Sequence, residues 1–194
     1  AKNCGFSDSL RGGALSPYYT WKETCRETLF EGLDAAQWLS RRTNYPIYAG
    51  YGTATHFALD KRGEIPSGAA GMVNIGDYLV MRLCGLSAAG TDRSIAASFG
   101  GFDLAAGGFD FDALCAAGVD IRYYPQVAAD AKAAGSYRGI PVMPAVGDNQ
   151  ASFYAAAGED SCVVGVNVGT GAQVSVTDTR FESIQTGEVR PFTR

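Results

Sequence analysis

The residue most suited to acid–base chemistry is Asp148. It stands in the run Gly147-Asp148-Asn149-Gln150, after an apolar stretch and before a helix of small residues expected over 148–157. Asp is a favoured N-cap residue, so one interpretation is that Asp148 caps this helix. The other is a general base at the carboxyl end of a strand, where open α/β sheets bind ligands and an ionised carboxylate can accept a hydroxyl proton. Both interpretations stay open at this point.

A second candidate is the tripeptide Gly169-Thr170-Gly171, which separates two β-rich runs at 162–167 and 172–177. One interpretation is a hairpin turn that needs glycine. The other is a phosphate loop, in which backbone N–H groups and the Thr170 hydroxyl bind an anion. It is not a P-loop, because the chain contains no G-x-x-x-x-G-K-[ST] motif.

Two aromatic residues are candidates for sugar contact. Trp21, with Glu23 close behind, and Tyr51, between two glycines, offer flat apolar faces beside polar groups. Such a face can pack on the C–H side of a sugar or polyol while carboxylates and amides bind its hydroxyls. The alternative for both aromatics is ordinary packing in the core or in a turn.

Composition removes several classes of function. The chain has 194 residues, a net charge of −4 and a single histidine, His56. This charge gives no basis for binding nucleic acid or an anionic membrane, and no apolar run of bilayer-spanning length occurs. No G-x-S-x-G motif accompanies His56, so we expect a structural role for it and a carboxylate as proton acceptor. Five widely spaced cysteines without C-x-x-C indicate reduced thiols in a cytoplasm rather than a zinc or disulfide scaffold.

Hydrophobic periodicity and helix-ending glycines predict the supporting elements. Helices are expected over 27–41, 53–59, 74–84, 94–99, 109–117 and 148–157. Strands are expected near 18–21 and over 140–146, 163–167 and 172–177. The last two form a hairpin, in which the alternation of valine with Ser175 and Thr177 predicts one buried face and one more polar face.

Two further polar sites lie within or beside these expected elements. The run Thr91-Asp92-Arg93-Ser94 is either a functional loop or a helix start, and Asp77 is expected to make local hydrogen bonds.

The composition changes near 158–161 from one typical of helices to one typical of a β-hairpin. We therefore place a domain boundary there, with residues 1–158 in a first domain and 159–194 in the start of a second.

In their order along the chain these pieces resemble the FGGY family of carbohydrate kinases, within it the sedoheptulokinase-like and xylulokinase-like branch. GDNQAS followed by NVGTGAQVS is the most specific pair. The matching stretches are SPYYTW at 16–21, AGYGTATHFAL at 49–59, NIGDYLVMRLCGL at 74–86, TDRSIAASFGGFD at 91–103, VGDNQASFYAA at 146–156 and VVGVNVGTGAQVSV at 163–176.

The resemblance implies an α/β, ribonuclease-H-like fold of the actin and hexokinase superfamily, with two domains around a cleft. This chain would hold the latter part of the first, sugar-binding domain and the start of the second, ATP-binding domain. By the same resemblance, Asp148 would be the general base, and ATP with Mg²⁺ would be the cofactors. Trp21, Tyr51 and Asn149 would contact the sugar.

The phosphate groups of ATP would contact Gly169, Thr170 and Gly171, by the same resemblance. The chain departs from the family pattern in lacking an N-terminal D-x-G-T loop, so no metal ligands are expected within it. After Trp21, Glu23 and Arg26 stand where relatives often have a W-x-D-x-R pattern, so Glu23 is kept as a substrate-binding candidate.

The leading hypothesis is therefore an ATP-dependent kinase of a ketose or polyol, with a small-molecule partner, no nucleic acid or membrane, and a homodimer as a candidate assembly. The alternative is a non-catalytic sugar-binding or scaffold relative. Because transfer requires base, metal and triphosphate in one constellation, we expect the 194 residues alone to be inactive.

Overall fold

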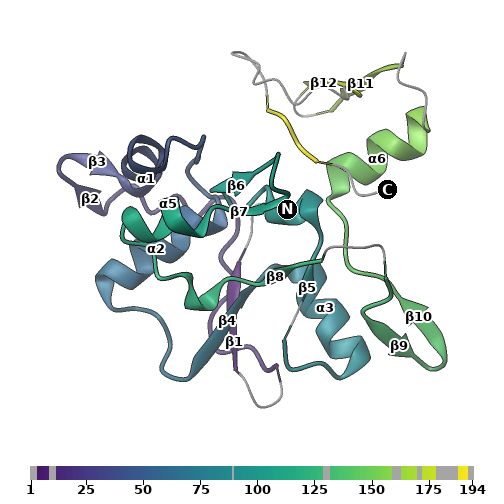
Figure 1. The fold of residues 1–194 in the computed structure, drawn as a ribbon, viewed down its shortest axis with the longest axis horizontal. Helices are drawn as coiled ribbons and strands as arrows, with labels where there is room; N and C mark the ends of the chain where they lie inside the picture. Colours follow the sequence, from purple (N-terminus) through teal and green to yellow (C-terminus); the bar gives the residue numbers. More distant parts are fainter. Residues whose placement is uncertain are drawn as a thin grey trace.

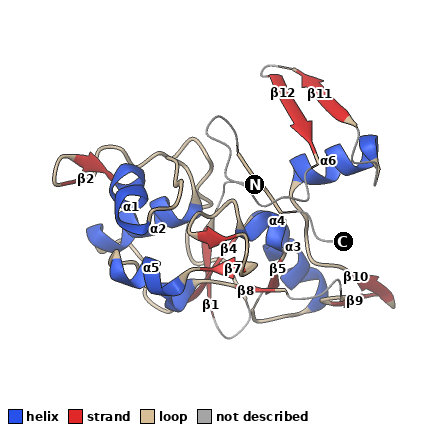
Figure 2. Cartoon of the chain, turned by 45° about the horizontal axis from the view of Figure 1, so that its top comes forward, coloured by secondary structure: helices blue, strands red, loops and turns tan. Residues whose placement is uncertain are grey.

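The computed structural model describes residues 4–8, 12–88, 90–128, 132–158, 163–169, 172–177 and 188–191. Figure 1 shows two groups of elements. Most of the chain up to residue 128 forms one body, and α6 with the hairpin β11–β12 lies at one end of the molecule. Figure 2 shows the same separation from a second direction.

The helices of the described residues begin mostly at polar caps. Asp34, Asn74, Asp92 and Asp110 each accept a hydrogen bond from a backbone N–H of the helix that follows, which satisfies donors that the helix itself leaves unpaired. The helices are α1 (Ala35–Thr43), α2 (Gly52–Arg62), α3 (Ile75–Cys84), α4 (Arg93–Ala96), α5 (Phe111–Ala116) and α6 (Asp148–Ala157), with a short 3₁₀ helix at Ile121–Tyr123.

The strands pair two by two. β1 (Gly5–Asp8) is antiparallel to β4 (Ala69–Val73), and β5 (Gly90–Thr91) is parallel to β8 (Gln126–Val127). The others form antiparallel hairpins: β2 (Leu29–Phe30) with β3 (Leu33–Asp34), β6 (Phe102–Asp103) with β7 (Gly108–Phe109), β9 (Gly135–Tyr137) with β10 (Ile140–Val142), and β11 (Val164–Val168) with β12 (Ala172–Val176).

The core lies in the body, around β1 and β4. These strands lie between the group α1, α2 and α5 on one side and α3 on the other (Figures 1 and 2). Phe6, Leu39, Phe99 and Leu114 are at most 1% exposed. Close packing requires glycine at Gly52, where an added Cβ would lie 2.5 Å from the Phe99 ring. The apolar residues of α1, α2 and α5 therefore share one core with the central pair of strands.

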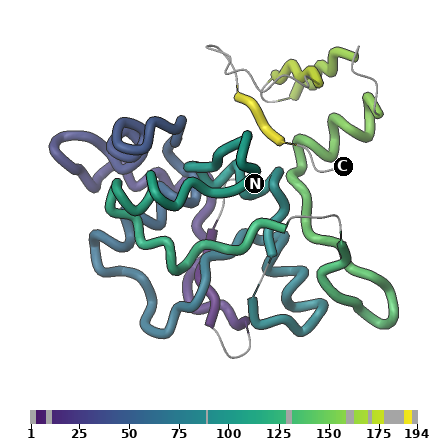
Figure 3. Tube along the Cα trace, viewed as in Figure 1, coloured from purple at the N-terminus to yellow at the C-terminus, as the bar shows by residue number. Residues whose placement is uncertain are grey.

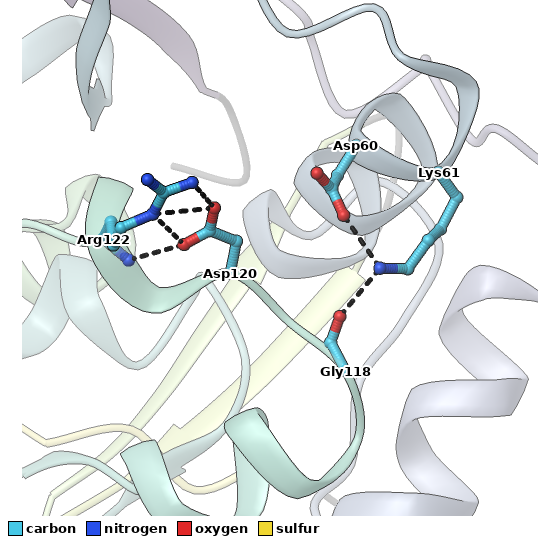
Figure 4. A network of polar contacts seen from close by, with 5 residues as sticks. All are labelled: Asp60, Lys61, Gly118, Asp120 and Arg122. Atoms are coloured by element: carbon cyan, nitrogen blue, oxygen red, sulfur yellow. Dashed lines mark hydrogen bonds and ion pairs between the residues drawn. The ribbon is translucent and has the colours of Figure 1, made fainter.

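A surface network ties the end of α2 to the turn after α5 (Figure 4). Lys61 Nζ bonds Asp60 Oδ2 at 2.8 Å and the Gly118 carbonyl at 3.0 Å. Nearby, Arg122 Nη2 bonds Asp120 Oδ2 at 2.6 Å, and the hydrogen bonds from Arg122 lower the pKa of the Asp120 carboxyl. Exposed pairs of this kind contribute little stability, so the network orients the turn more than it holds the fold.

The prediction of a helix over 27–41 is wrong in its first half. The hairpin β2–β3 occupies this stretch, turning at Glu31 and Gly32, whose φ angles are 50° and 81°. Helix α1 begins only after Asp34, which accepts the Gln37 N–H while the Gln37 side chain accepts the Asp34 N–H. This capping box sets the helix start more strongly than the apolar spacing does.

Most other predicted elements are confirmed with shifted ends. The helices expected over 53–59, 74–84, 109–117 and 148–157 are α2, α3, α5 and α6, and that over 94–99 shortens to α4. The strand expected near 18–21 is only an isolated bridge from Tyr19 to Cys4. The run 140–146 forms a strand only over β10, which pairs in a hairpin with β9.

The hairpin expected after residue 162 is confirmed, but its faces are not as predicted. Val164 lies opposite Val176 and Val166 opposite Val174, so the valines share one face, and that face is exposed. The opposite face is the partly covered one, because it packs on α6. An added Cβ at Gly165 would lie 2.7 Å from the Phe153 ring of α6.

Candidate functional site

Asp148 is the first residue of α6 and is exposed. The N-cap is Gly147, whose backbone is extended, so the interpretation of Asp148 as the cap itself is wrong. The Asn149 N–H donates to Asp148 Oδ1 at 3.0 Å. A helix N-terminus favours negative charge. An exposed carboxylate at this position can accept a proton from a bound hydroxyl.

The turn before Asp148 is held by Ser94 of α4. The Gly147 N–H donates to Ser94 Oγ at 2.9 Å, and Gln150 Nε2 donates to the Ser94 carbonyl at 3.2 Å. The Ser94 hydroxyl in turn donates to Asp92 Oδ1. Ser94 and Asp92 are 1% and 4% exposed. Of the two interpretations of the run 91–94, the helix start is therefore correct, and this helix start also fixes the residue before Asp148.

A second buried carboxylate lies near this support. Asp77 is 1% exposed and accepts a hydrogen bond from Asn74 Nδ2, which confirms the expected local hydrogen bonding. Burial raises the pKa of Asp77 from 3.8 to about 7, although the hydrogen bond from the Asn74 side chain lowers it. Asp77 is therefore a buried structural acid whose protonation changes near neutral pH.

The backbone of Trp21 lies against Gly50, directly before Tyr51, and the two aromatic side chains differ in exposure. Gly50, with φ of 84°, packs on Trp21 so closely that an added Cβ would lie 2.4 Å from the Trp21 carbonyl oxygen. The Trp21 side chain is 61% exposed, so its interpretation as a core residue is wrong. Tyr51 is 2% exposed. Glu23 is exposed on the loop after Trp21.

Two residues that the sequence analysis missed lie against Tyr51. The Tyr51 hydroxyl donates to Glu188 Oε1 across 137 residues of sequence, and Arg190 Nη2 lies 2.8 Å from the same oxygen. Burial and the Glu188 hydrogen bond raise the pKa of the Tyr51 hydroxyl. No local pattern marks Glu188 or Arg190, since an acidic and a basic residue two apart are common on any surface.

The remaining candidate site residues are exposed or lie outside the described residues. Asn149 is exposed on the first turn of α6, and Gly169 is exposed where β11 ends. Thr170 and Gly171 lie outside the described residues, so the phosphate-loop interpretation stays a prediction. The pairing of Val168 with Ala172 leaves three residues to connect the strands, which is the length expected of a glycine-containing hairpin loop.

His56 is buried within an aromatic cluster. It is fully buried on α2, with ring centroids of Phe6, Tyr123 and Tyr124 between 5.5 and 6.0 Å away. Burial lowers its pKa to about 4. A neutral, enclosed imidazole supports the structural role expected for this residue.

Within the described ranges, one group of side chains has the spacing of a metal site. Ligand atoms of Glu23, Cys25 and Glu27 lie within 4.8 Å of one another. However, Arg62 Nη1 donates to Glu27 Oε1 at 2.9 Å and thus already supplies a cation there. This group therefore does not fit Mg²⁺, which also prefers oxygen ligands over a thiol.

Comparison with known proteins shows which sequences the chain resembles. No protein-family model matches the chain. The chain is 29% identical over 184 residues to sedoheptulokinase from Mus musculus, covering 89% of this chain and 37% of that protein. It is 27% identical over 193 residues to the Homo sapiens sedoheptulokinase, covering 94% of this chain and 39% of that protein. The chain thus spans well under half the length of these curated relatives.

Solved structures show the same fold. Over 89% of this chain and 38% of the other, it matches a xylulose kinase from Lactobacillus acidophilus with a TM-score of 0.72 at 22% identity. A Plasmodium falciparum glycerol kinase solved with ADP matches over 89% and 37%, with a TM-score of 0.67 at 17% identity.

These matches confirm the resemblance to FGGY carbohydrate kinases. The chain has part of their ribonuclease-H-like fold, and its relatives are of the sedoheptulokinase and xylulokinase type. In the described part of the chain, no helix has both the length and the apolar character to cross a membrane.

Proposed function

We propose that the protein is an ATP-dependent carbohydrate kinase that phosphorylates a hydroxyl of a ketose or polyol such as sedoheptulose or xylulose. The observation that carries this proposal is the place of Asp148, exposed at the start of α6 on a turn that buried Ser94 holds. The relatives that the chain matches are named as kinases of such sugars, which supports the substrate class.

In this proposal each residue has a limited task. Asp148 accepts the proton of the substrate hydroxyl, which makes that oxygen the nucleophile. Trp21 presents an exposed ring to the C–H face of the sugar. ATP would supply the phosphoryl group, and Mg²⁺ would neutralise the negative charge of the phosphates. Glycine at 169 and 171 and the Thr170 hydroxyl would contact the phosphates.

The compartment belongs to the same proposal. Cys4, Cys25, Cys84 and Cys115 are free thiols, two of them buried. Free thiols are typical of a reducing compartment. We therefore place the protein in the cytoplasm, where ATP and free sugars are available.

A coupled ADP-release assay on the protein that carries this sequence tests the proposal, with a panel of ketoses, aldoses and polyols. We expect sugar-dependent ADP release with a ketose or polyol.

Asp148→Asn tests the role of the carboxylate and should lower kcat about 10²–10⁴-fold, the usual contribution of a general base. Asp112→Asn is the matched control, since Asp112 is also an exposed carboxylate in the first turn of a helix. Unchanged turnover in Asp148→Asn would remove the base assignment, and sugar binding without ADP release would favour a non-catalytic relative.

A further inference from the structure

The short segment Glu188–Pro191 contacts the body at Tyr51. Figure 3 draws it in yellow between the β11–β12 hairpin and the body. The Tyr51 hydroxyl donates to Glu188 Oε1, and Arg190 Nη2 lies 2.8 Å from the same oxygen. Tyr51 of the body is thus hydrogen-bonded to a segment that follows the hairpin.

The three side chains differ in exposure, and the difference assigns them different tasks. Tyr51 is 2% exposed, the Arg190 side chain 14% and the Glu188 side chain 39%. The tyrosine is fixed from two sides, because it is the N-cap residue of α2 and its ring meets the Tyr48 ring edge-on at 5.3 Å. The buried phenol and the largely covered guanidinium therefore orient a carboxylate that solvent can reach.

An exposed aromatic ring belongs to the residue whose backbone packs on Gly50, directly before Tyr51. Tyr51 follows Gly50, which packs directly on the Trp21 backbone, and the Trp21 side chain is 61% exposed. A carboxylate accepts hydrogen bonds from hydroxyls, and a guanidinium donates to their oxygens. An aromatic face beside such a pair matches a polyhydroxylated ligand, which has C–H faces to pack and hydroxyls to bind.

We propose that Glu188 and Arg190 bind hydroxyls of the sugar or polyol substrate, and that Tyr51 is a positioning residue that holds Glu188. The identity of the ligand as a kinase substrate rests on the function proposed above. The segment after the hairpin would thus contribute to sugar specificity, together with Trp21 from the body.

Calorimetric sugar binding without nucleotide, combined with steady-state kinetics, tests this assignment. Glu188→Gln should raise both the Kd and the KM for the sugar about 10- to 100-fold. This is the loss of affinity expected when hydrogen bonds to a charged group are removed. The KM for ATP should stay unchanged. Tyr51→Phe should weaken sugar binding less, because the Glu188 carboxylate remains and loses only its hydrogen bond from the Tyr51 hydroxyl. Glu31→Gln and Tyr137→Phe, exposed and distant in sequence from this segment, are the matched controls.

A set of deoxy analogues separates contact from structure. If Glu188 binds a particular hydroxyl, the analogue that lacks it should bind wild type and Glu188→Gln equally well, whereas a structural defect would weaken every analogue alike. Equal losses across all analogues, or no loss at all, would overturn the inference, as would the absence of sugar binding to the wild-type protein. Sugar binding that depends on Glu188 without ADP release would overturn the kinase proposal and leave this site standing.

Discussion

The body and the unit of α6 with β11–β12 bury their apolar residues to very different extents. In the body, Leu39 and Leu114 are fully buried and Phe6 is 1% exposed. On the hairpin, five valines that share one face are 60–76% exposed, at positions 164, 166, 168, 174 and 176. A two-stranded hairpin is marginal in isolation. The body therefore carries the stability of the described structure, and the hairpin β11–β12 depends on its few contacts with α6.

The largest expected effect is on the core of the body. Leu114→Ala should lower the free energy of unfolding by about 2–5 kcal/mol, because it leaves a cavity at a fully buried site. Urea unfolding followed by circular dichroism measures the change. Leu29→Ala on β2, where the side chain is 61% exposed, is the control and should change little. Equal effects of the two variants would contradict the contrast in burial.

Asp77 should make the stability of the body depend on pH. Burial raises its pKa in the folded state from 3.8 to about 7, so the native protein keeps a proton that the unfolded chain releases. The stabilisation is fully present below pH 3.8 and is lost as the pH rises through about 7. Its slope can reach about 1.4 kcal/mol per pH unit, the limit for one proton.

Asp77→Asn tests this pH dependence. The variant should lose the decline in Tm between about pH 4 and 7, the interval between the two pKa values, and it should be more stable than wild type at pH 8. The exposed Asp112→Asn should keep the wild-type profile. Parallel Tm curves for wild type and Asp77→Asn would show that Asp77 is ionised throughout this range.

Ser94 connects the body to the second unit, so Ser94→Ala should affect both. It removes the acceptor of the Gly147 N–H and the hydroxyl that donates to the buried Asp92 Oδ1, which keeps the backbone N–H of residue 94, at a cost of about 1–3 kcal/mol in the free energy of unfolding. If Asp148 is the base, kcat should also fall while the sugar KM changes little, since the turn before Asp148 loses its support. Ser152→Ala, exposed on α6, is the matched control. A loss of stability with unchanged kcat would limit Ser94 to a structural role.

The sequence predicted those helices and strands whose positions are determined by local signals. Helix α3 was predicted because its apolar run ends at Gly85, which is its C-cap, and the hairpin because two β-rich runs flank a glycine turn. The helix expected over 27–41 failed because the hairpin β2–β3 depends on pairing that apolar spacing does not encode.

The candidate site was predicted in the same partial way. Asp148 and Trp21 could be selected from residue type and resemblance. Glu188 and Arg190 could not, since their contact with Tyr51 joins positions 137 residues apart. The role of Ser94 was also missed, because its bonds to Gly147 and Gln150 span 53 and 56 residues.

The smallest expected effect is on the valine face of the hairpin. Val166 is 65% exposed and lies opposite Val174 in β12, so Val166→Ala removes little buried area. The free energy of unfolding should change by less than about 0.5 kcal/mol, as for other surface substitutions, with a slight loss because alanine has a lower strand propensity than valine. Val166→Thr keeps the branched shape and should match wild type more closely. Urea unfolding at several protein concentrations measures both variants. A loss in Val166→Ala comparable to that of Leu114→Ala would show that the valine face is covered in solution, and the contrast between the two units would then reflect a missing contact rather than a difference in packing.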